Sequence, residues 1–225
     1  MDIHLHEDEE LEKLKEWGKN YGVALILGAV IGLGGLFGYR YWTHHLEQRA
    51  AAASTLYDEV IYNLNQGKPD QAAKLGGKVL QDYKSTPYAA LTALLLAKSS
   101  YDKGDLASAQ RQLQWAMDHA RQKAVGHVAR LRLAHLLIAE GKIDGALKLV
   151  ESVKDTGGYT SSYDELRGDL FRAKGDMDKA RSAYTKALSE DSGGKYSEVL
   201  RMKLADLGPA PAPSATAAQP AKVSP

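Results

Sequence analysis

The sequence predicts an all-α protein in which a single N-terminal transmembrane helix precedes a solenoid of about four helical hairpins. An apolar run occupies residues 21–42, and a motif of glycine and alanine recurs four times after it. No segment alternates between apolar and polar side chains, so strands are not expected. The 225-residue chain has no cysteine, which excludes disulfides, thiol catalysis and cysteine-based zinc sites.

The apolar run contains nineteen consecutive uncharged residues, from Tyr21 to Tyr39. As a helix it would be about 28 Å long, close to the hydrocarbon thickness of a bilayer. A cleaved export signal has a shorter apolar region behind a short basic segment, whereas an acidic segment comes first here. A buried helix of a soluble domain would more often carry polar interruptions. We therefore expect an uncleaved anchor, with Lys19, Arg40 and Trp42 at the membrane interfaces.

The segment before the run contains seven acidic residues and three lysines. Only the basic residues near a span strongly influence its orientation. Three lysines precede the run and two arginines follow it, so the tally favours a cytoplasmic N-terminus by a single residue.

One face of the predicted span consists of small residues, which would let another helix approach closely. Two G-x-x-x-G motifs lie on this face, although glycine is common in membrane helices and such motifs also arise by chance. The expected helix-packing residues are Gly28, Gly32, Gly34, Gly35 and Gly38.

A glycine followed five residues later by an alanine recurs at Gly67, Gly104, Gly141 and Gly175, at intervals of 37, 37 and 34 residues. Each glycine is followed by a helical pattern, usually with an aspartate placed to cap it. A second helical run precedes each glycine and sets a small residue opposite the alanine. These are features of tetratricopeptide-type hairpins, which bury a core by stacking. Gly76 makes the first hairpin degenerate, because a large apolar residue is expected there.

Residues 40–65 contain no glycine or proline and should continue the first helix into the first hairpin, and residues 194–207 predict a final capping helix. The expected regions are an acidic cytosolic segment (1–20), the transmembrane helix (21–42), a tetratricopeptide-like repeat domain (43–207) and a disordered tail rich in proline and alanine (208–225).

The sequence offers no catalytic or metal site and no cofactor motif. It lacks a phosphate loop, a nucleophile elbow and an H-E-x-x-H motif. His127 and His135 lie eight residues apart, about 12 Å along a helix, too far to share a metal ion. Asp164 and Glu165 are expected to be solvated charges on a helix surface. A net charge of +1 gives no case for nucleic-acid binding.

Alignment on the turn glycines places a mixture of aromatic, apolar and basic residues on the concave face of the repeats. This mixture suits an extended segment that carries acidic groups. Leu95 and Val128 occupy positions where a clamp for a terminal carboxylate needs polar residues, so such a ligand is not expected. The alternative is that Tyr57 and Ile61 only pack against a neighbouring helix and the basic residues are solvated. The predicted groove residues are Tyr57, Ile61, Lys98, Tyr101, Arg132, His135 and Arg172.

The order of segments resembles the YfgM-type family, an ancillary subunit of the bacterial SecYEG translocon. The likeness is most specific at "GAVIGLGGLFGYRYW", "QGKPDQAAK" and "DELRGDLFRAKGDMDKARSAY", and the proline- and alanine-rich tail departs from it. The resemblance implies a non-enzymatic inner-membrane protein with a cytosolic N-terminus and a periplasmic repeat domain. It also implies two partners, the translocon and a membrane-anchored periplasmic chaperone, and a role in assisting secreted or outer-membrane proteins. The runner-up is an adaptor whose cytosolic segment restrains a response regulator.

Overall fold

The computed structural model describes residues 3–191, 194 and 197–209, except for the side chains of residues 3–14, 20, 23–26 and 29. The chain divides into two compact units, residues 1–55 and 56–225. Within the described residues every regular element is helical, which confirms the all-α prediction.

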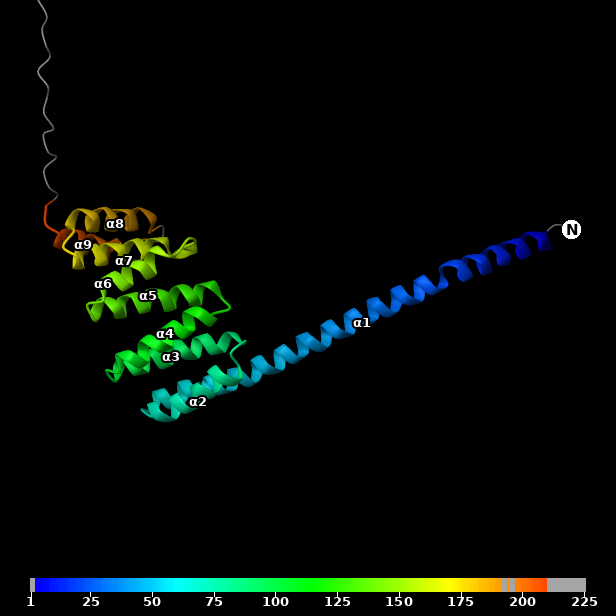
Figure 1. Cartoon of the computed structure of the whole chain (residues 1–225), viewed down its shortest axis with the longest axis horizontal. Coiled ribbons are helices and arrows are strands. Elements are labelled where there is room, and N and C mark those ends of the chain that lie inside the picture. Colours follow the sequence, from blue (N-terminus) through cyan, green and yellow to red (C-terminus); the bar gives the residue numbers. More distant parts are fainter. Residues whose placement is uncertain (1–2, 192–193, 195–196, 210–225) are drawn as a thin grey trace, which may run out of the picture. The chain divides into compact units, whose positions relative to one another are not determined.

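The first unit consists of the N-terminal part of α1, which runs from Ile3 to Asn65 without a break (Figure 1). The predicted continuity of the helix through residues 40–65 is confirmed. Large apolar side chains on it are well exposed, among them Ile31 at 71% and Phe37 at 67%. No helix is apolar enough over a sufficient length to cross a membrane, as judged from the residues that the structure describes. Side chains 23–26 and 29 of the predicted span lie outside that set.

The second unit contains the end of α1 and the hairpins that follow it. In Figure 1, α3 to α8 stack as successive hairpins in chain order. The helices are α2 (Pro69–Asp82), α3 (Pro87–Asp102), α4 (Leu106–His119), α5 (Lys123–Ala139), α6 (Ile143–Glu151), α7 (Thr160–Ala173), α8 (Met177–Glu190) and α9 (Ser197–Asp206), with a 3-10 turn η1 (Gly157–Tyr159) before α7.

The four turn glycines all have a positive φ, of 66° at Gly67, 78° at Gly104, 74° at Gly141 and 80° at Gly175. A side chain with a Cβ is disfavoured in this left-handed conformation, which explains the choice of glycine. The turns therefore occur where the repeat motif predicts them, and the prediction of a hairpin solenoid is confirmed.

The aspartate after the turn glycine has one of two roles. Asp105 and Asp176 accept hydrogen bonds from the backbone N–H groups of the residues three positions later and cap α4 and α8, as expected. In the other two turns a lysine takes the cap position without a side-chain bond. There the aspartate lies in the first turn of the helix and pairs with a lysine at the next turn, Asp70 with Lys103 at 2.7 Å and Asp144 with Lys174 at 2.8 Å.

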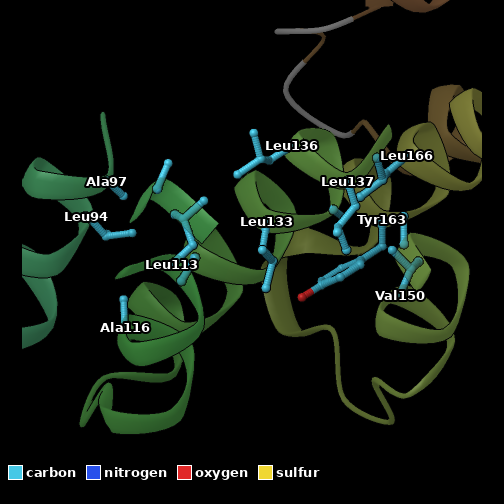
Figure 2. Packing of buried hydrophobic residues seen from close by; sticks show 14 of the residues in the cluster. Leu94, Ala97, Leu113, Ala116, Leu133, Leu136, Leu137, Val150, Tyr163 and Leu166 are labelled. Carbon is cyan, nitrogen blue, oxygen red and sulfur yellow. The ribbon is translucent and has the colours of Figure 1, made fainter. Parts of the chain in front are cut away.

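The core consists of alanine and leucine or valine at helical spacing, as the repeat pattern predicts. Ala109, Ala146 and Ala180, the three later motif alanines, are buried. Figure 2 shows that Leu113 of α4 and Leu133 of α5 belong to one continuous cluster, which extends through α6 to α7. Stacking therefore buries the face that a single hairpin would leave exposed.

Glycine at two helix positions makes room for a side chain from the neighbouring helix. A Cβ on Gly168 would overlap the ring of Tyr184, which is fully buried. A Cβ on Gly76 would lie 2.7 Å from Leu96 Cδ1. Leu96 thus fills the space in the first hairpin where the sequence lacks a large apolar residue.

Helix α9 closes the end of the array, as predicted for a capping helix. Leu200 is fully buried in a cluster with Tyr184, and Leu204 and Leu207 pack against the same cluster. The expected tail falls largely on residues 210–225, which lie outside the described residues.

Candidate protein-binding groove

Five of the seven predicted groove residues lie at two constant positions on the first helix of their hairpins. Ile61, Lys98 and His135 each lie six residues before their turn glycine, and Tyr101 and Arg172 lie three residues before theirs. Because the hairpins stack in order, equivalent positions form rows along the same face of the array.

Four of the seven predicted residues line one cavity of about 380 Å³ between α3, α4 and α5. Lys98 and Tyr101 come from α3, and Arg132 and His135 come from α5. The walls between them are apolar. They are formed by Leu94, Ala97, Asp102, Ala109, Leu113, Leu136 and Ala139, of which only Asp102 is charged.

The polar groups at this cavity differ in how well they are satisfied. Lys98 Nζ lies 2.7 Å from a carboxylate oxygen of Asp102. Arg132 is exposed and forms no hydrogen bond or ion pair with another described residue. Tyr101 is 54% exposed, so its ring is also available to a ligand. Arg132 can therefore bind a carboxylate by donating hydrogen bonds to it beside an apolar recess.

Crowding of its ring by the cavity walls lowers the pKa of His135, and the nearby carboxylate of Asp169 opposes this effect. The ring is still accessible to solvent at the cavity mouth. His135 is thus favoured in its neutral form, in which it offers both a hydrogen-bond donor and an acceptor.

A second cavity of about 560 Å³ is lined by Ile61 of α1, Leu95 of α3 and Lys103 at the following turn. Lys98 and Asp102 line both cavities, so the two recesses adjoin at this ion pair.

The structure does not bring the other two predicted residues into either cavity. Tyr57 packs its half-buried ring against Tyr88 of α3, with centroids 5.7 Å apart, and burial raises its pKa. This is the packing role that the sequence left open as an alternative. Arg172 lies exposed in the last turn of α7.

An ion cluster that the sequence did not predict lies where α7, α8 and α9 meet. Lys203 Nζ lies 2.7 Å from Glu165 Oε1 and 2.8 Å from each carboxylate oxygen of Asp169. Tyr184 donates a hydrogen bond of 2.7 Å to Asp169. Burial raises the pKa of Tyr184, and the bond to Asp169 raises it further. The register could have revealed Asp169, because it lies six residues before Gly175.

The expectation that Asp164 and Glu165 are solvated surface charges is wrong. Asp164 is only 2% exposed and forms ion pairs with Arg167 and with Lys186, the latter at 3.0 Å. Glu165 is mostly buried against Lys203. A buried carboxylate must be paired, and the basic partners of Asp164 come from its own helix and from α8.

The predicted helix-packing face of α1 is open. A Cβ added to Gly28, Gly32, Gly34, Gly35 or Gly38 would meet no atom within 4 Å. No group of three or more potential metal ligands occurs among the described residues.

Comparison with known proteins identifies the repeats. Residues 15–209 match the model of the tetratricopeptide repeat-like domain family. Among solved structures, residues 41 to the end of MamA from Desulfovibrio magneticus RS-1 are similar in fold, with a TM-score of 0.50 and 14% identity over 69% of this chain and 92% of that one.

Two curated relatives match nearly the whole chain. The ancillary SecYEG translocon subunit of Escherichia coli K12 is 33% identical and covers 92% of this chain and 99% of its own. The subunit of the same name from Haemophilus influenzae is 30% identical and covers 92% of this chain and 100% of its own.

Proposed function

Because the chain belongs to the tetratricopeptide-like family of ancillary SecYEG translocon subunits, we propose that it is a non-enzymatic protein-interaction subunit of a bacterial translocon. In this proposal it binds an extended segment of a partner protein in the groove between α3 and α5. The single observation that carries the binding role is the apolar cavity bordered by Tyr101 and by Arg132, which has no ion-pair partner among the described residues.

The chemistry of the groove favours an acidic segment with an apolar side chain. The apolar walls gain from burying such a side chain, and Arg132 supplies a bidentate partner for a carboxylate. Lys98 and Lys103 also line the recesses, but each is paired with an aspartate, so the net positive charge there comes from Arg132. Net attraction of acidic chains would also speed their encounter with the groove.

The proposed anchor of the protein is residues 21–42, a span in the bacterial inner membrane with a cytoplasmic N-terminus and a periplasmic repeat domain. Its support is the nineteen-residue uncharged run together with the exposure of apolar side chains such as Ile31 and Phe37. The glycine face of α1 would then be free to contact a helix of another membrane protein.

A second partner in this proposal is a membrane-anchored periplasmic chaperone, which the subunit would link to the translocon as secreted or outer-membrane proteins emerge. Photocrosslinking from the span and from the groove in native membranes tests the two contacts separately. Translocon adducts are expected from the first position and chaperone or client adducts from the second. Groove adducts only with cytosolic proteins would overturn the proposed arrangement.

The alternative role, restraint of a cytosolic response regulator, rests on the acidic composition of residues 1–20. The side chains of residues 3–14 lie outside the described set. Copurification with and without residues 1–20 separates the two roles. A regulator that is lost with this segment while the translocon is retained would favour the alternative for the cytosolic end.

The binding role of the groove is tested by replacing Tyr101 and Arg132 with alanine. Each contact is worth on the order of 1–2 kcal/mol if it is a hot spot, so partner capture should fall at least tenfold. Neither side chain belongs to the buried core, so the melting temperature should change little. The matched control is Tyr62→Ala with Arg111→Ala, which removes the same side-chain types from exposed positions outside both cavities. Unchanged capture with a sharply lower melting temperature would assign Tyr101 and Arg132 to the core instead.

A further inference from the structure

The fourth hairpin differs from the others in the charge of its groove positions. Six residues before the turn glycine stand Ile61, Lys98 and His135 in the first three hairpins and Asp169 in the fourth. Ten residues before it, the fourth hairpin has Glu165 where the first three have an aromatic residue or leucine. Two carboxylates therefore occupy positions that carry no acidic residue in the first three hairpins.

A lysine from another helix pairs with both carboxylates and offsets one of their two negative charges. Lys203 of α9 binds Glu165 at 2.7 Å and both oxygens of Asp169 at 2.8 Å. The side chains of Lys203 and Glu165 are 21% and 22% exposed and that of Asp169 is 13% exposed, so all three charges are partly withdrawn from water. Ion pairs at such depth are screened less by salt than pairs at the surface.

The position of this lysine is fixed by the packing of α9. Leu200, one turn before Lys203, is fully buried, and the Lys203 ammonium lies 5.6 Å from the centroid of the Tyr184 ring. At the end of the helix, Arg181 donates hydrogen bonds to the carbonyl oxygens of Leu207 and Gly208. The ammonium group is therefore held in place rather than free to follow a ligand.

We propose that Lys203 determines the charge specificity of the groove: by offsetting one of the two negative charges of Glu165 and Asp169 it lessens the repulsion of an acidic segment that extends past His135 toward the last hairpin. This inference rests on the proposed binding of an acidic segment. Without Lys203, the two carboxylates would repel such a segment and would favour a basic one.

The ion cluster is close enough to the main cavity to act on a ligand there. Asp169, Lys203 and Glu165 all influence the pKa of His135, which lines the cavity, and α5 packs against α7. A change of one charge about 10 Å from a ligand charge, at an effective dielectric between that of protein and water, alters affinity by about threefold for each acidic group of the ligand.

The test is a charge cycle at Glu165 and Lys203 in the full-length chain. Its probes are a fluorescent peptide of phenylalanine, glycine and aspartate and matched peptides with asparagine or lysine in place of aspartate. Lys203→Met should weaken binding of the aspartate peptide by about three- to tenfold at low salt, with a smaller effect as salt is added. Glu165→Gln should tighten it by a similar factor. The double variant Lys203→Met/Glu165→Gln, which has the same net cluster charge as the wild type, should return to within about twofold of it.

The lysine and asparagine peptides and a control variant complete the design. The lysine peptide should respond in the opposite direction to the aspartate peptide, and the asparagine peptide should respond little. Lys179→Met removes an equal charge from an exposed pair on α8 and should leave all three affinities unchanged.

The outcomes separate the two proposals. Failure of the wild-type chain to prefer the aspartate peptide contradicts the acidic groove itself. If the wild type, Lys203→Met and Glu165→Gln all prefer the aspartate peptide to the same degree, Lys203 does not determine specificity and only stabilises the fold. If Lys203→Met lowers the melting temperature too far for binding to be measured, Glu165→Gln decides alone, and no gain in its affinity for the aspartate peptide refutes the inference.

Discussion

Replacement of Gly168 by alanine should destabilise the protein although it improves helix propensity. Its new Cβ would overlap Cε1 and Cδ1 of the Tyr184 ring and approach Cζ to 2.9 Å. The ring cannot move aside easily, because Tyr184 is fully buried and its hydroxyl donates a 2.7 Å bond to Asp169. The substitution therefore forces α7 and α8 apart or breaks that bond.

The magnitude follows from three contributions. Overpacking of a core costs about 1–3 kcal/mol. A weakened hydrogen bond to a charged acceptor adds about 1.5 kcal/mol or more. The higher helix propensity of alanine offsets about 1 kcal/mol of this loss in stability. The net loss in the free energy of unfolding is about 2–3 kcal/mol, which lowers the melting temperature by roughly 5–10 °C for a domain of this size.

Thermal and urea denaturation followed by circular dichroism measure this loss. Gly77→Ala is the matched control, since Gly77 lies inside α2 with no atom within 4 Å of an added Cβ. It should gain about 0.5–1 kcal/mol. A Gly168→Ala protein as stable as the Gly77→Ala protein would refute the close approach of α7 and α8.

Three further predictions address a cap, a titrating group and the proposed span. Asp176→Ala removes the cap of α8 and should lower the melting temperature by a few degrees, whereas Asp178→Ala in the first turn should have a smaller effect. His135 has a folded pKa below its ordinary 6.5, so its contribution to stability is present above that pH and is lost on acidification through the folded pKa. His135→Gln should therefore flatten the fall in denaturation midpoint between about pH 7 and pH 5, and an unchanged slope would contradict this. Leucine at Gly28 and Gly32 should preserve membrane insertion but reduce copurification of translocon components; full recovery of those components would exclude this face as the contact.

The sequence was most informative where the backbone itself imposes a residue type. A left-handed turn requires glycine, so Gly104 and Gly175 mark hairpin turns without any knowledge of tertiary contacts. Buried alanines at the same offset, such as Ala109 and Ala180, follow from close packing of two helices and were equally predictable. These local rules determine most of the solenoid.

Ion pairs between distant parts of the chain were not predictable in the same way. Glu165 and Asp169 contact Lys203 only after α9 has packed onto α8. Lys203 is 38 residues from Glu165 and 34 residues from Asp169 in sequence. Spacing along a single helix gives no information on such partners. Asp164 was wrongly expected to be solvated because its burial and its pairing with Lys186 depend on the packing of α7 against α8, although Arg167 lies three residues away on its own helix. Four of the predicted groove residues do meet in one cavity. Tyr57 instead packs against Tyr88, a contact that the repeat register does not predict.

The lysine–aspartate pairs between turns join neighbouring hairpins at two of the three junctions of the array. Lys103 with Asp70 joins the first hairpin to the second, and Lys174 with Asp144 joins the third to the fourth. Between the second and third hairpins the equivalent positions are Ala107 and Glu140, which cannot form such a pair.

The main cavity lies at this untethered junction, between α3 and α4 of the second hairpin and α5 of the third. This junction is held by apolar side chains of α4 and α5, which belong to the continuous core, and not by a turn-to-turn ion pair. Added salt should therefore weaken the first and last junctions of the array while it leaves the walls of the cavity packed.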